Sequence, residues 1–102
     1  MIHVVALITA KPGQREAVLR EFRQIVPIVR AEKGCIEYGP ATDTPNAGAV
    51  QTQLGPDSFA VIEKWESLDA LAAHAAAPHM SSYGNKVKGL LANRAIHVLS
   101  PA

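Results

Sequence analysis

The stretch SFAVIEKWE, residues 58–66, decides the fold because it is the clearest strand in the sequence. Successive side chains of a strand point to opposite faces, and both faces of this one carry apolar residues. Ala60 and Ile62 lie on one face, and the other face carries Phe59, Val61, Glu63 and Trp65. A strand that is apolar on both faces is covered from both sides. We therefore expect residues 58–66 to lie in the interior of a sheet.

The surrounding sequence predicts further strands and helices. The predicted strands are residues 2–10, 35–42, 58–66 and 95–99. The predicted helices are residues 14–33, a helix that Ser67 begins and Pro78 ends, and a piece at about residues 80–91. This order is the ferredoxin-like β-α-β-β-α-β pattern of the α+β class. A length of 102 residues suits one domain, so residues 1–102 are predicted to be a single domain.

Proline and glycine mark the connections. Within residues 14–33, apolar side chains recur at spacings of 4, 3 and 4 along one stripe, and Pro27 lies inside the helix. Gly34 is expected to end this helix in the left-handed conformation. Residues 43–57 are a polar excursion in which apolar and polar side chains alternate over residues 50–54. We expect a short edge strand or hairpin arm there.

The two strands with two apolar faces also predict a partner. Helices can cover one face of a four-stranded sheet, yet residues 2–10 and 58–66 are apolar on both faces. Monomers avoid exposed apolar patches of that size. We therefore expect a homodimer that packs sheet against sheet and leaves a cavity in each protomer.

Composition excludes several classes of protein. Ten Lys and Arg residues offset nine Asp and Glu residues and form no basic stripe, which argues against nucleic-acid binding. No stretch resembles a membrane span, and the apolar start lacks the flanking pattern of a signal peptide, so a cytoplasmic protein is expected. The single cysteine, Cys35, excludes an intrachain disulfide. Phosphate-binding glycine loops, dinucleotide fingerprints and Ser-His-Asp elbows are absent, so no cofactor is predicted.

Five residues near the C-terminal half carry the candidate chemistry: Glu63, Trp65, His74, His79 and Tyr83. If the face that carries Glu63 lines a cavity, burial disfavours its charged form, and Glu63 can donate or accept a proton. Alternatively, Glu63 is a strand-end residue that pairs with an arginine. Trp65 is either a core aromatic or the wall of a site for a flat aromatic ligand.

The two histidines lie on either side of Pro78. The apolar stripe of the preceding helix is centred near Leu68, which puts His74 at the edge of that stripe. His79 falls at the start of the next helix, where the positive helix end favours a neutral imidazole that can accept a proton. A capping role is its alternative. A spacing of five across a proline is not the i, i+4 pair of a helical zinc site, so no metal is predicted.

Several motifs follow one another in a characteristic order. They are Lys11-Pro12-Gly13, Gly34-Cys35 with Tyr38, and Glu63-x-Trp65-Glu66-Ser67 with Leu71, His74, Pro78 and His79. In this arrangement the whole chain resembles the antibiotic biosynthesis monooxygenase family, and it is most similar to the quinol monooxygenases within it. The resemblance implies a dimeric α+β barrel in which the sheet of each protomer backs the other.

The resemblance also implies a reaction. The family includes cofactor-independent oxygenases, so a small aromatic quinol or phenolic polyketide and O2 are the implied partners. The implied substrate-binding residues are Trp65, Phe59 and Tyr38, and the implied catalytic residues are His74, His79, Glu63 and Tyr83. One of the histidines would accept the phenolic proton. Haem-degrading members carry an asparagine on the first strand, whereas residues 2–10 have none, so haem breakdown is not expected.

Two other functions stay open at this point. The same histidines and glutamate could isomerise a small carbonyl metabolite without oxygen, in which case Lys86, Lys88 and Arg94 are the nearest anchors for a phosphate. The domain could also be a dimeric module that binds an aromatic ligand without catalysis.

Overall fold

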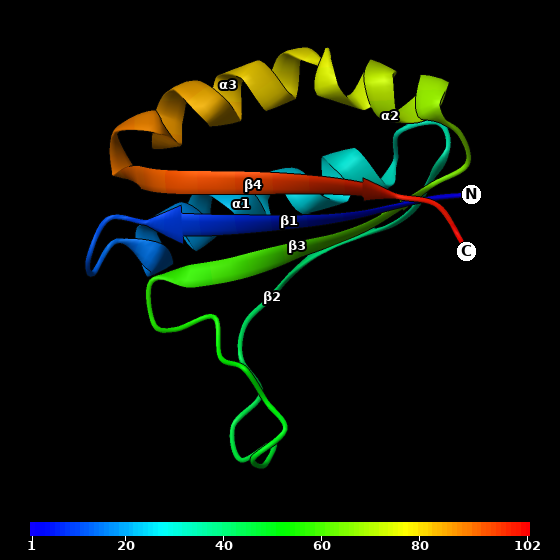
Figure 1. Ribbon diagram of the computed structural model, residues 1–102. Helices are drawn as coiled ribbons and strands as arrows, with labels where there is room; N and C mark the ends of the chain where they lie inside the picture. The colour runs from blue at the N-terminus through cyan, green and yellow to red at the C-terminus, as the bar shows by residue number, and fades with distance from the viewer.

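The computed structural model describes residues 1–102 and contains a four-stranded antiparallel sheet whose helices pack on one face (Figure 1). The strands are β1 (Ile2–Ala10), β2 (Cys35–Ala41), β3 (Ser58–Trp65) and β4 (Leu91–Leu99), in the spatial order β2-β3-β1-β4. The helices are α1 (Arg15–Arg30), α2 (Leu68–Ala75) and α3 (Pro78–Val87), and a 3-10 turn, η1 (Lys88–Leu90), leads into β4. This is the predicted ferredoxin-like order, with its second helical segment divided in two. None of the helices combines the length and the apolar character needed to cross a membrane.

The strands β1 and β3 lie in the middle of the sheet, as their two apolar faces predict. Val4 is paired with Glu63 and Ala6 with Val61, so these side chains share the face that the helices cover. The apolar stripe of α1 packs on that face, and its buried members include Val18, Phe22, Ile25 and Val29. The hydrophobic core therefore lies between α1 and the helix-side face of β1 and β3.

The edge strand expected within residues 50–54 is not formed, and that prediction is wrong. The Asp43 carboxylate accepts hydrogen bonds from the backbone N–H groups of Leu54 and Gly55, both at 2.9 Å. These local bonds close the excursion on itself and replace the ladder of a strand. Val50 is 92% exposed, so the alternating pattern has no core to bury.

The last strand begins at Leu91, four residues earlier than the predicted Ala95. Its added residues pair with the end of β1, where Ala10 lies opposite Leu91 after a shift in register. Lys11 also donates its backbone N–H to the carbonyl of Leu90 at 2.8 Å. Pairing with β1 therefore extends β4 to residues 91–94, where the local sequence pattern is too weak to predict a strand.

The buried face of α2 also differs from its prediction. Ser67 caps the helix as expected, because its hydroxyl accepts a hydrogen bond from the Ala70 N–H at 3.1 Å. Leu68, however, is 61% exposed, and His74 is the one buried residue of the helix. A short alanine-rich helix has a weak apolar stripe. The contacts of His74 with Glu32, Trp65 and Tyr38 therefore determine which face of α2 points inward.

Gly34 lets the connection after α1 approach α2 closely. The helix already ends at Arg30, so Gly34 lies in the following turn, in the expected left-handed conformation with φ +84°. A Cβ atom on Gly34 would lie 2.6 Å from the Cβ of Ala70. The Gly34 carbonyl accepts a hydrogen bond from the Glu66 N–H at 2.9 Å. These contacts hold the turn that contains Glu32 beside the start of α2.

The sheet face away from the helices carries apolar side chains in its centre. Val5 lies opposite Ile62 and His97, and Leu7 lies opposite Ala60 and Ala95. Val5, Leu7 and Ile62 stay partly accessible because no helix covers them.

A substitution pair tests the close approach of Gly34. Gly34→Ala adds both left-handed strain, about 1–2 kcal/mol, and a clash with Ala70. Gly13→Ala at φ +77° adds only the strain, because nothing lies within 4 Å of its Cβ position. We expect Gly34→Ala to lower the free energy of unfolding by at least about 1 kcal/mol more than Gly13→Ala in urea denaturation. Equal losses would show that the contact is not tight.

The uncovered face generates the second prediction, that a second copy of the chain packs on it. Val61 is not a test of this contact, because it is 4% exposed and faces the helices. Leu7→Lys places a charge on the uncovered face and should convert a dimer to a monomer in analytical ultracentrifugation. The melting temperature of the unmodified protein should rise with protein concentration. Arg23→Ala, on the exposed side of α1, is the control. A monomer with a concentration-independent melting temperature would contradict the prediction.

Candidate active site

A cavity of about 500 Å³ lies between the helix-side face of the sheet and the helices α2 and α3. Hydrophobic side chains make up most of its wall, and Val4, Ala6 and Val61 form part of its floor. On the β4 side, Ile96 and Val98 line the cavity although they are 53% and 49% exposed. The cavity therefore opens to solvent along this edge strand.

Few polar side chains reach the cavity. They are Tyr38, Glu63, His74, Ser81, Tyr83 and Arg94. An apolar chamber with a small set of convergent polar groups is the usual form of a small-molecule site. The predicted residues His74, Glu63, Tyr83 and Tyr38 are thus brought together around one space.

His74 is the most constrained of these groups. Only 5% of it is exposed, and its ring contacts two aromatic rings. The Trp65 ring centre is 4.7 Å away at 33°, and the Tyr38 ring centre is 5.3 Å away in an edge contact. Nδ1 of His74 lies 2.9 Å from Oε2 of Glu32. The two ring contacts and the hydrogen bond together fix the orientation of the imidazole.

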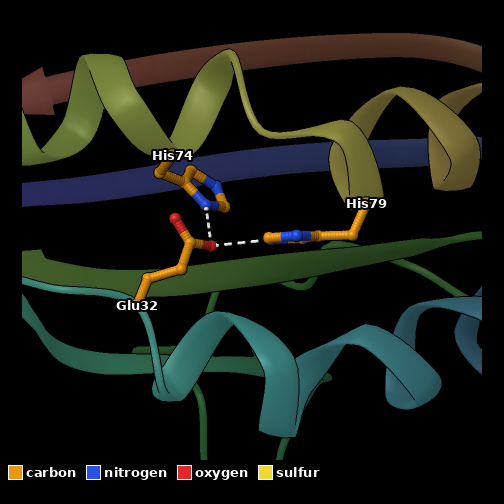
Figure 2. A group of neighbouring side chains, drawn as sticks. All are labelled: Glu32, His74 and His79. Carbon is orange, nitrogen blue, oxygen red and sulfur yellow. Dashed lines mark hydrogen bonds and ion pairs between the residues drawn. The ribbon is translucent and has the colours of Figure 1, made fainter.

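The same carboxylate oxygen also contacts the second histidine, as Figure 2 shows. Nε2 of His79 lies 2.9 Å from Oε2 of Glu32. Glu32 projects from the turn after α1, His74 from the end of α2 and His79 from the first turn of α3. His79 does not line the cavity; it lines a separate depression of about 260 Å³ with Lys86 and Glu21. The two histidines therefore share a partner but face different spaces.

Glu32 determines which nitrogen of His74 carries hydrogen. A carboxylate only accepts hydrogen bonds, so Nδ1 of His74 is the donor and Nε2 keeps its lone pair in the neutral ring. Nε2 of His74 has no hydrogen-bond partner in the protein. It is also not fully buried, because Arg15 Nε is the one side-chain nitrogen or oxygen that is both fully buried and without a partner. Nε2 therefore stays accessible, and the space beside His74 is the cavity. The site holds a fixed imidazole with a free basic nitrogen.

Glu63 lines the cavity as a largely buried carboxylate. Its Oε1 accepts a hydrogen bond from Trp65 Nε1 at 2.9 Å. Burial raises the pKa of Glu63 above its ordinary value, although the hydrogen bond from Trp65 acts in the opposite direction. No arginine forms an ion pair or a hydrogen bond with Glu63, whose side-chain partner is Trp65. The arginine-paired alternative for Glu63 is therefore wrong.

The two tyrosines supply neutral hydroxyl groups. Burial raises the pKa of Tyr83 to about 12 and also raises the pKa of Tyr38. Both hydroxyls therefore stay protonated at neutral pH and can donate hydrogen bonds to a negatively charged oxygen.

Two predicted wall residues lie behind the wall, and one partner was missed. Phe59 and Trp65 are completely buried and do not line the cavity, so their rings support the wall from behind.

Glu32 was not predicted, because an acidic residue near a helix end is common and its histidine partners lie over forty residues away in sequence. The one local feature of the sequence near Glu32 that pointed to a special structure was Gly34, which predicts a turn there.

The sequence profile of the antibiotic biosynthesis monooxygenase family matches residues 1–86. The chain belongs to this family. Within it, the chain is 44% identical to the "Probable quinol monooxygenase YgiN" of Escherichia coli K12, over 99% of this chain and 98% of that protein.

Solved structures of similar proteins share the fold. PA3566 from Pseudomonas aeruginosa is 32% identical with a TM-score of 0.81, covering 99% of this chain and 93% of that one. Rv0793 from Mycobacterium tuberculosis is 25% identical with a TM-score of 0.80, covering 99% and 94%. These similarities agree with the ferredoxin-like order of strands and helices.

The burial of Glu63 predicts a pH-dependent cost to stability. Because its pKa is raised in the folded protein, the unfolded chain loses this proton first as pH rises above about 4.5. The free energy of unfolding therefore falls as pH rises from the ordinary pKa of Glu63 to its raised pKa in the folded protein. Glu63→Gln keeps an acceptor for Trp65 and removes this cost, so its stability relative to the unmodified protein should increase between pH 4 and pH 7 in urea denaturation.

Glu37→Gln is the control for that experiment, because Glu37 is exposed and pairs with Lys64 on the other face of the sheet. A stability difference for Glu63→Gln that stays constant with pH would show that burial does not perturb Glu63.

Proposed function

We propose that the cavity is the active site of a cofactor-independent monooxygenase that acts on a quinol or a related phenolic compound. The observation that carries this proposal is the fixed imidazole of His74, which has a free Nε2 at the wall of an apolar cavity. The volume of about 500 Å³ lies within the usual range for small-molecule sites. Membership of the family supports a monooxygenase, and the name of the YgiN relative supports the quinol class.

The first step is removal of a phenolic proton. Nε2 of His74 accepts it, and the ring becomes an imidazolium whose Nδ1–H still bonds to Glu32. The carboxylate stabilises the positive charge without taking the proton itself. A positioned base of this kind contributes roughly 10²–10⁴-fold to a rate. His79 is the weaker candidate for the base because it does not line the cavity.

The deprotonated quinol then supplies the electrons for oxygen. The ring carbon beside the phenolate bonds to one atom of O2, and the peroxide anion takes the proton back from His74. Loss of the ring C–H proton breaks the O–O bond, leaves a carbonyl on the ring and releases hydroxide, which this proton converts to water. The balance is quinol plus O2 to hydroxyquinone plus water, with all four electrons from the quinol.

The remaining polar groups stabilise the negative charge that forms on oxygen. Tyr83 lines the cavity as a neutral donor, and Arg94 is the one arginine or lysine in its wall. Tyr83 lies on the helix side, where apolar walls limit access of water and strengthen such an interaction, whereas Arg94 is exposed on β4 at the open side of the cavity. Glu63 lines the same cavity, and its raised pKa supports a role as a proton relay.

Replacement of His74 tests the proposal. The unmodified protein should increase O2 consumption with a reduced naphthoquinone above the autoxidation rate. His74→Asn should lower kcat roughly 10²–10⁴-fold, because it removes the base and leaves the walls in place. The measurement is oxygen uptake with an electrode, with a thermal melt to confirm that the variant folds.

His97→Asn is the matched control for loss of a histidine outside the cavity wall, and because His97 lies on the uncovered sheet face, analytical ultracentrifugation should confirm that this variant keeps the oligomeric state of the unmodified protein. No uptake above autoxidation across a panel of hydroquinones would contradict the proposal. Turnover of a carbonyl metabolite without oxygen would identify the same residues as an isomerase site.

A further inference from the structure

We propose that Glu32, His74 and His79 form a binding site for a divalent transition-metal ion such as Zn²⁺ or Co²⁺, and that the bound ion blocks His74 as a base. The binding itself does not depend on the proposed function, whereas the block of catalysis rests on it. Three features favour this site: the distances between the ligand atoms, the charges around them, and the parts of the fold that hold the three side chains in place.

The ligand atoms are already close to coordination distances. Oε2 of Glu32 lies 2.9 Å from each histidine nitrogen, and all three atoms lie within 4.8 Å of one another. Metal–ligand bonds of about 2.0–2.1 Å place neighbouring ligand atoms roughly 3.0–3.4 Å apart. The oxygen–nitrogen spacing of 2.9 Å is just below this range, whereas the two nitrogens, which lie within 4.8 Å of each other, would have to approach to roughly 3.4 Å. Two imidazoles and one carboxylate are a ligand set of known transition-metal sites.

The charges around the cluster also favour a cation. The two histidines are the sole ion-pair partners of Glu32, and no lysine or arginine forms an ion pair with Glu32 or with the nearby Glu63. The region therefore holds two carboxylates and no permanent positive charge within bonding distance. A divalent ion would supply that charge.

The three ligands are held by separate rigid parts of the fold. The aromatic rings of Trp65 and Tyr38 hold His74, and the Gly34 turn holds Glu32 beside α2. Side-chain exposure rises from 6% at His74 to 15% at Glu32 and 23% at His79. An ion can therefore enter from the His79 side, with water in the remaining coordination positions.

Metal binding would change what His74 presents to the cavity. A neutral imidazole that binds a metal through Nδ1 carries its hydrogen on Nε2. The hydrogen on Nδ1 of His74 thus moves to Nε2, and the hydrogen on Nε2 of His79 moves to Nδ1, so that neither ring loses a proton overall. His74 Nε2 then becomes a donor and can no longer accept a phenolic proton.

Titration with Co²⁺ tests the site directly, because bound Co²⁺ has a visible absorption that reports histidine ligands. We expect one Co²⁺ per chain in the unmodified protein. Glu32→Gln and His79→Asn should weaken binding at least about tenfold. His97→Asn, which removes a histidine outside the cluster, should bind as tightly as the unmodified protein. Thermal melts without metal confirm that each variant folds.

Zn²⁺ should also raise the melting temperature of the unmodified protein, and at the same Zn²⁺ concentration the rise should be clearly smaller for Glu32→Gln. If Co²⁺ binding is absent, survives Glu32→Gln or is lost in His97→Asn, the site is wrong and Glu32 only holds the histidines by hydrogen bonds.

The tautomer of His74 is a separate readout for the block. Nitrogen NMR should show hydrogen on Nδ1 without metal and on Nε2 with Zn²⁺, whether or not the protein oxidises quinols. Hydrogen that stays on Nδ1 with Zn²⁺ bound would overturn the block. Oxygen uptake that Zn²⁺ abolishes and a chelator restores would support it, and uptake that Zn²⁺ does not change would contradict it. Failure of Co²⁺ binding with normal oxygen uptake would leave the proposed function intact.

Discussion

One carboxylate oxygen, Oε2 of Glu32, is the point at which three separate parts of the chain meet. It bonds to His74 from α2 and to His79 from α3, and Glu32 itself belongs to the turn after α1. Buried or half-buried charges need such partners, because an unpaired carboxylate loses its hydration at a large cost. The shared oxygen therefore fixes the two later helices against the first half of the chain. It also selects the hydrogen position on the imidazole that faces the cavity.

The sheet makes the cavity possible because its central strands are apolar on both faces. On the helix side, β1 and β3 provide a flat apolar floor, and α1 fills part of the space above it. The short helices α2 and α3 cover the rest less tightly and leave the cavity. Two short helices joined by a break at Pro78 can present His74 and His79 to one oxygen from different sides, whereas on a single straight helix the spacing of five residues would turn the two side chains about 140° apart.

The sequence predicted the parts of the fold that depend on local patterns. Residues 2–10 form β1 with the predicted bounds, and the alternation in residues 58–66 placed Glu63 on the cavity side. Alternation alone was misleading at Val50, where local hydrogen bonds to Asp43 prevail over strand pairing. Glu32 could not be predicted, because its role arises only when the turn after α1 packs against helices that follow much later in the chain. Long-range polar contacts of this kind leave no periodic signal.

The pairing of β1 with β4 brings the two ends of the chain together, with His3 opposite Leu99. The excursion between β2 and β3 projects away from the sheet (Figure 1), and Asp43 closes its base. A circular permutant could therefore join the ends by a short linker and open the chain within residues 44–53. Every strand pair would survive, but Glu32 would then leave the ribosome after both histidines. Such a chain would separate the order of synthesis from the geometry of the finished site.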